Sequence, residues 1–334
     1  MPHSHSHSHW RRDEPQFYNF LALDRARLDA PPPAGGLTGA LMSRDTRSEA
    51  HTFVVELPRG WRTQFDARDA MLELFILRGD ASLDGERVGS SGYLQLPQGC
   101  GGGELRSEAG ALALLFWNPD IPSFSEPYTR NRVLKAWREP WTPSVPGAHG
   151  IMHKSLRLPD PLPHPNYEGF DGGPGGYLRF QFIPPSFISA EEHVHHECFE
   201  EIILLQGDTL LLNEGVMAIG SVVCHPQEWY HAPFATRSGS LILVHTDAPM
   251  GFPWPPRPYP NADGVVESYL DDAPFDVPTE HVAWADSPLA ATQEADPDYA
   301  AWRATPDGAL WGEVVGRGVA SEYRRSWRRD AGRA

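Results

Sequence analysis

The residues whose types and spacing could do chemistry lie between Glu192 and Gly207. His193 and His195 are two residues apart, so in a β-strand both imidazoles point to one face. Glu200 follows His195 after four intervening residues, a gap that lets the chain turn and return on a neighbouring strand. Gly207 comes after six more residues, where a hairpin needs a residue that tolerates positive φ. Imidazole and carboxylate without thiolate suit Fe(II), Mn, Co, Ni or Zn.

A second segment supplies a third imidazole. Gly220 is followed by five residues and then Pro226, and His231 comes five positions after the proline. We expect His231 on another strand, near the same end of a barrel.

Two series of short strand-like runs must position these side chains. The first series lies between residues 52 and 117 and the second between 177 and 246, each divided by glycine, proline and aspartate turn signals. Residues 75–80 correspond to 203–208, and 92–97 correspond to 220–226. The sequence therefore predicts an all-β protein with an internal duplication.

These motifs resemble the cupin family. The first cupin pattern is matched by His193, His195, Glu200 and Gly207, and the second by Gly220, Pro226 and His231, with Glu228 where the family usually has glycine. The resemblance covers roughly residues 45–250 as two jelly-roll barrels, a bicupin, and its style is similar to ChrR-type cupin domains and cupin dioxygenases. It implies one divalent metal per chain, held by His193, His195, Glu200 and His231. Fe(II) is favoured because cupin oxygenases of this kind commonly use it, and Zn, Mn, Ni and Co remain open.

The first barrel lacks these ligands. When Gly79 is aligned with Gly207 and Pro97 with Pro226, the ligand positions hold Phe65, Ala67, Leu72 and Gly102, with Glu73 one residue away. None of these residues is a histidine, so we expect a first barrel without metal.

Four further residues are candidates for the catalytic pocket. Arg179 and Gln181 orient a substrate oxygen if they face inward, whereas the opposite alternation turns Phe180 and its neighbours inward instead. Trp229 forms an aromatic wall or fills the core. His245 is either a base beside the metal ligands or merely buried.

The domain boundaries follow from composition. We predict a flexible N-terminal arm or tag at 1–40, a first cupin barrel at 41–120 and an irregular linker at 121–174. The metal-binding cupin barrel follows at 175–250, and a proline-rich, partly helical extension at 251–334, with helices at about 289–304 and 309–329. Residues 3–9 alternate histidine and serine, so we interpret 1–9 as an expression tag or a natural arm that would bind metal nonspecifically, and exclude it from the site.

Composition excludes several classes of protein. The 334 residues hold 28 Lys+Arg and 44 Asp+Glu, a net charge of −16, which argues against a nucleic-acid partner. The longest apolar run, 109–117, is too short for a membrane helix. Three cysteines without CxxC spacing favour a reducing cytoplasm.

The favoured function is that of a non-haem Fe(II) dioxygenase that acts on a small oxygenated organic substrate with O2. Two alternatives stay open: a redox-neutral isomerase, lyase or hydrolase, and a non-catalytic ChrR-like sensor of a small molecule or metal. The resemblance also implies a homodimer.

Overall fold

The computed structural model describes most of the chain between residues 12 and 309. The described residues are 12–31, 33–119, 130–143, 151–157, 163–164, 167–171, 176–184, 187, 192–193, 198–211, 214–229, 231, 234–236, 239–247, 257–258, 297–306 and 309. Within these ranges, no helix is long and apolar enough to cross a membrane. The three cysteines, Cys100, Cys198 and Cys224, form no disulfide.

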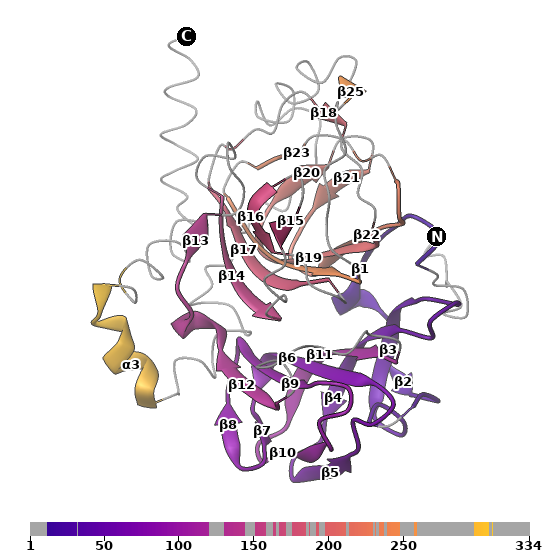
Figure 1. Ribbon diagram of the computed structural model, residues 1–334, viewed down its shortest axis with the longest axis vertical. Helices are drawn as coiled ribbons and strands as arrows, with labels where there is room; N and C mark the ends of the chain where they lie inside the picture. The colour runs from indigo at the N-terminus through magenta and orange to yellow at the C-terminus, as the bar shows by residue number, and fades with distance from the viewer. Residues whose placement is uncertain are drawn as a thin grey trace. The chain divides into compact units, whose positions relative to one another are not determined.

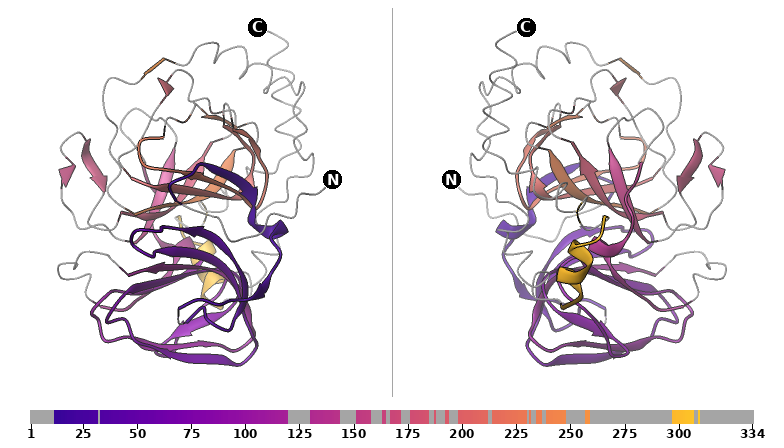
Figure 2. Two further views of the ribbon diagram at one scale, coloured as in Figure 1. Left: turned by 90° about the vertical axis from the view of Figure 1, so that its right-hand side faces the viewer. Right: turned by 90° about the vertical axis from the view of Figure 1, so that its left-hand side faces the viewer.

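The chain divides into two compact units. The first comprises residues 1–15, 22–137 and 288–296, and the second comprises residues 16–21, 138–287 and 297–334. Each unit is built mainly from antiparallel β-strands (Figure 1). Both views in Figure 2 show the strands of each unit as curved ribbons.

The first unit contains a seven-stranded and a four-stranded sheet. The larger sheet has the order β12-β9-β6-β11-β4-β3-β2 and the smaller has the order β5-β10-β7-β8. The bounds are β2 Ala26–Arg27, β3 Thr38–Arg44, β4 His51–Leu57, β5 Trp61–Phe65, β6 Met71–Gly79, β7 Ala81–Leu83, β8 Glu86–Val88, β9 Gly92–Leu96, β10 Gly103–Ser107, β11 Ala111–Asn118 and β12 Arg132–Lys135.

The second unit contains a seven-stranded sheet, a three-stranded sheet and two short strand pairs. The larger sheet has the order β1-β22-β19-β24-β17-β14-β13, the three-stranded sheet is β21-β20-β23, and the pairs are β15-β16 and β18-β25. The bounds are β1 Gln16–Asn19, β13 Thr142–Pro143, β14 Met152–Arg157, β15 Pro163–His164, β16 Tyr167–Asp171, β17 Leu178–Ile183, β18 Glu192–His193, β19 Glu200–Gly207, β20 Thr209–Leu211, β21 Gly215–Met217, β22 Ser221–His225, β23 Phe234–Ala235, β24 Ser240–Thr246 and β25 Arg257–Pro258.

Three short helical elements complete the described chain. They are the 3₁₀ helices η2, Phe20–Ala22, and η3, Ala136–Arg138, and the α-helix α3, Pro297–Arg303.

The central strands of the two large sheets repeat each other. In the first unit β6 lies between β9 and β11, and in the second unit β19 lies between β22 and β24. The register is interrupted at the same place, between Leu112 and Ala113 against β6 and between Leu204 and Gln206 against β24. Related structures retain β-bulges at fixed positions. The bulge that the two sheets share therefore supports the predicted repeat. The strand pairing corrects one predicted correspondence. Gly220 corresponds to Ser91 and not, as predicted, to Gly92.

A cluster of buried apolar side chains fills the space between the sheets of the second unit. The large sheet contributes alternate residues of β19, β22 and β24, and the three-stranded sheet contributes Leu211, Met217 and Phe234. We call the face of the large sheet that carries these alternate residues the inner face; they are Ile202, Leu204, Val223, Ile242 and Val244.

Two predicted segments differ from the structure. The span 121–174, expected to be an irregular linker, contributes β12 to the first large sheet and β14 to the second. The N-terminal arm is not wholly flexible, because β1 pairs along its length with β22. Proline and glycine are frequent on both sides of β14, and that composition concealed it. Residues 1–9 and most of the two predicted helices lie outside the described residues. Within the described part of the first predicted helix, the structure contains α3.

Candidate metal centre

Glu200 begins the central strand of the second unit, and its neighbours are set by register. It lies opposite His225 on β22 and opposite Thr246 on β24. Directly opposed residues of antiparallel strands project to the same face, and Glu200 has the same parity as Ile202. The carboxylate therefore belongs to the inner face, where Glu200 as a whole residue is 6% exposed.

His225 is the last residue of β22 and is held by two carboxylates. Its Nδ1 lies 3.1 Å from Glu200 Oε2, and its Nε2 lies 2.9 Å and 3.0 Å from the two oxygens of Glu214. Burial by itself lowers the pKa of His225, but the hydrogen bonds and charges of Glu200 and Glu214 outweigh it and raise the pKa to about 9.

His231 follows the turn after β22 and points toward Glu200. Its Nε2 is 3.9 Å from Glu200 Oε2, and its Nδ1 is 3.3 Å from the carbonyl oxygen of Trp229. Since that carbonyl can only accept a hydrogen bond, Nδ1 donates it, and Nε2 is the nitrogen that lies toward the carboxylate.

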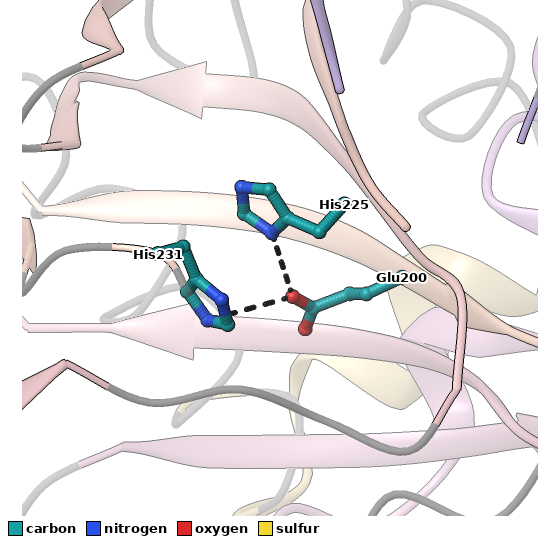
Figure 3. Close-up of side chains that lie close together, drawn as sticks. All are labelled: Glu200, His225 and His231. Carbon is teal, nitrogen blue, oxygen red and sulfur yellow. Dashed lines mark hydrogen bonds and ion pairs between the residues drawn. The ribbon is translucent and has the colours of Figure 1, made fainter. Parts of the chain in front are cut away.

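These three residues form one compact buried group (Figure 3). One ligand atom from each of Glu200, His225 and His231 lies within 4.8 Å of the other two. A carboxylate and imidazoles at this separation could bind a metal ion, and their chemistry fits the divalent first-row metals.

His193 and His195 cannot be placed in this group from the structure. His193 is described only as part of β18, which pairs with β25, and His195 lies outside the described residues. Their role as ligands remains a prediction.

Arg179 and Gln181 lie on the inner face. They are opposite Val244 and Ile242, two members of the buried cluster, so the alternation that turns Phe180 inward does not occur. The guanidinium carbon of Arg179 lies 4.0 Å from the centre of the Tyr177 ring, and Arg179 is buried.

The structure does not bring Trp229 and His245 into the group by their side chains. The indole of Trp229 is 41% exposed, and it is the backbone carbonyl of this residue that contacts His231. His245 has the parity of Leu243, opposite to that of Val244, and its Nδ1 lies 3.2 Å from Glu201 Oε2. It therefore lies on the other face of the sheet from Glu200.

His225 is the member of the group that the sequence motifs missed. The cupin pattern assigns no ligand to the position before Pro226. The available signal was parity, because His225 ends an apolar strand two residues after Val223, on the side that faces the core.

The comparisons with known proteins bear on the fold. No model of a known protein family matches the chain, and no curated protein matches it. A solved structure from Nostoc punctiforme, provisionally described as a dioxygenase, has a TM-score of 0.58 and 17% identity, and the match covers 74% of this chain and 87% of that chain. A Pseudomonas aeruginosa protein, provisionally described as glyoxylate-induced, has a TM-score of 0.51 and 13% identity, with 70% and 88% covered.

At these identities the likeness shows the fold alone. With the repeated antiparallel sheets, it shows an all-β protein built from two jelly-roll units. In the second barrel this fold encloses a buried Glu/His/His group that could hold a metal ion.

Proposed function

We propose that the protein is a metal-dependent bicupin oxidoreductase, a non-haem Fe(II) dioxygenase that acts on a small oxygenated organic substrate. The observation that carries the proposal is the inner-face carboxylate of Glu200 with Nε2 of His231 3.9 Å from its Oε2. A buried carboxylate beside imidazoles, without a thiolate, is the donor set that iron and its neighbours accept.

His193 and His195 complete the ligand set in this proposal, as the cupin pattern implies. The repeat supports their placement, because in the first unit β10 pairs with β5 and Gly102 lies against the backbone of Phe65. The counterparts of Gly102 and Phe65 in the second unit are His231 and His193.

The bound ion would supply Lewis acidity and open coordination positions for the oxygens of the substrate and for O2. Glu200 offsets part of the charge of the ion. Arg179 and Gln181 project on the same face from β17, which β24 separates from the strand of Glu200, and orient a carboxylate or keto oxygen. Ile202 and Val244 keep the adjoining interior apolar and exclude water.

Elemental analysis of chain purified without chelator tests the proposal. The histidines of residues 1–9 are replaced by serine so that they do not contribute metal. We expect about one iron per chain, lost in His195→Ala and retained in His196→Ala, a control one residue outside the motif. Oxygen consumption with diketones and phenols should follow iron content.

Two outcomes would contradict the proposal. Retained iron and full turnover in His195→Ala would remove the ligand assignment. Turnover of a substrate at the same rate without oxygen would move the protein to a redox-neutral isomerase, lyase or hydrolase.

A further inference from the structure

His225 and His231 stand in different chemical situations although both rings adjoin Glu200. We infer that His225 is a positioning residue that holds Glu200 and His231 in place for the metal and does not bind the metal itself. This inference rests on the metal site of the proposed function and assigns a role within it to a residue outside the cupin pattern.

Both ring nitrogens of His225 contact carboxylate groups. Nδ1 contacts a carboxylate oxygen of Glu200, and Nε2 contacts both carboxylate oxygens of Glu214. Each nitrogen of His225 therefore has a carboxylate partner at hydrogen-bond distance. His231 differs in its contact with Glu200, because its Nε2 lies 3.9 Å from Glu200 Oε2, beyond hydrogen-bond distance, and its Nδ1 contacts the carbonyl oxygen of Trp229.

The orientation of the two rings leads to the same assignment. The rings of His225 and His231 are stacked, with centroids 4.3 Å apart and planes inclined by 13°. The lone pair of an imidazole nitrogen lies in the plane of its ring, so a metal ion must lie close to the plane of every histidine that binds it. Two nearly parallel planes at stacking distance do not share such a point, and His225 therefore cannot join His231 as a ligand in this arrangement.

His225 is anchored from outside the large sheet. Glu214 lies in the turn between β20 and β21, and its side chain is 16% exposed. The hydrogen bonds from His225 thus connect the large sheet to the three-stranded sheet of the same barrel. A carboxylate–histidine–carboxylate chain of this kind restricts the rotation of Glu200, and the stacking restricts the tilt of His231.

The first unit supports the inference, because its corresponding positions carry neither the carboxylate nor the histidine. The counterparts of Glu200 and His225 are Leu72 and Leu96, which are opposed in the same register and fully buried. The carboxylate and the histidine that supports it are both absent from the barrel without a metal motif.

The test compares metal affinity with ligand count in full-length protein whose residues 1–9 carry serine in place of histidine. Mn(II) titration gives affinity, and pulsed electron paramagnetic resonance of the Cu(II)-loaded protein counts coordinated imidazoles. Groups that orient metal ligands typically change affinity by about 10- to 100-fold when replaced. We expect His225→Gln to weaken Mn(II) binding by about 10-fold or more with the imidazole count unchanged, whereas His231→Gln loses one imidazole.

Glu214→Gln is the second variant, because its partly exposed side chain makes misfolding a smaller concern. It keeps a hydrogen-bond acceptor but removes the charge that anchors His225, and we expect it to weaken Mn(II) binding several-fold with the same imidazole count. If His225→Gln does not fold, the Mn(II) affinity of Glu214→Gln tests the positioning role of His225 instead.

The outcomes separate the inference from the function on which it rests. Loss of one imidazole in His225→Gln would make His225 a ligand, and unchanged Mn(II) affinity in both variants would leave it without a positioning role. Either result overturns the inference while the metal site stands. Metal binding that His231→Gln does not affect would overturn the site and the inference together.

Discussion

Leu72 and Glu200 occupy the same register position in the central strands of the two units. Leu72 lies opposite Leu96 in the first unit, and Glu200 lies opposite His225 in the second. The two barrels thus differ at this point by the exchange of a leucine pair for an ionisable pair.

Copying the leucine pair into the second unit should remove metal binding without unfolding the barrel. Replacing a buried ionic pair by packed apolar residues is often neutral or stabilising by about 1 to 4 kcal/mol. We expect the double variant Glu200→Leu/His225→Leu to bind no stoichiometric metal. Its metal-free form should unfold in urea at or above the midpoint of metal-free wild type.

The single variant Glu200→Leu is the control, because it leaves His225 beside Glu214 without its second carboxylate. It should be less stable than the double variant. A double variant that is the less stable of the two would show that the pair does not act as one unit.

His153 should make the stability of the protein depend on pH. Burial lowers the pKa of His153, the charge of Arg179 lowers it further, and together they bring it from 6.5 to about 3. The unfolded chain therefore binds the proton more readily, so this contribution to stability is present above pH 6.5 and is lost as the pH falls toward 3. At pH 5 the loss is about 2 kcal/mol.

Urea unfolding at pH 7.5 and pH 5.0 measures this effect. His153→Gln should lose about 2 kcal/mol less than wild type between the two values. Equal losses in the two proteins would exclude His153 as the source.

Gly207 should tolerate no side chain. Its φ is 83°, and a Cβ built there would lie 1.8 Å from the carbonyl oxygen of Gly239. Gly85 has a similar φ of 88° but nothing within 4 Å of its Cβ position. We expect Gly85→Ala to cost about 1 kcal/mol through backbone conformation alone, and Gly207→Ala to cost at least about 4 kcal/mol because backbone must also move.

Chemical unfolding of the two alanine variants gives the comparison directly. Similar losses of stability would mean that the close contact with Gly239 carries no cost.

Replacing Glu228 by glycine should stabilise the folded protein. It stands where the cupin pattern has glycine, and its φ is 62°, a conformation that costs residues with a Cβ about 1 to 2 kcal/mol. Glu228→Gly should therefore raise the free energy of unfolding by about 0.5 to 1 kcal/mol.

Gln227 provides the matched control, because it is exposed in the same turn. Its replacement by glycine should lower stability, since a negative φ gives glycine no advantage. A loss of stability in Glu228→Gly would contradict the explanation from strain.

The sequence predicted the barrel class and two members of the buried group. Glu200 and His231 follow from spacing along the chain, which is a local property. His225 was missed because its role arises from pairing with Glu200, 25 residues away, and from an anchor on a second sheet. The facing of Arg179 could not be decided from alternation, because Phe180 on the opposite face is also buried.

The pairing of β1 with β22 has a consequence for synthesis. Gln16 is translated before its partner Cys224, which follows about 200 residues later. At about 5 to 20 residues per second on the ribosome, that delay is roughly 10 to 40 s. During this interval β1 has no strand with which to pair. The β1–β22 pair forms only when most of the second barrel has been synthesised. A chain that lacks β1 would expose β22 as an unpaired edge of the sheet, and such edges are a common starting point for aggregation.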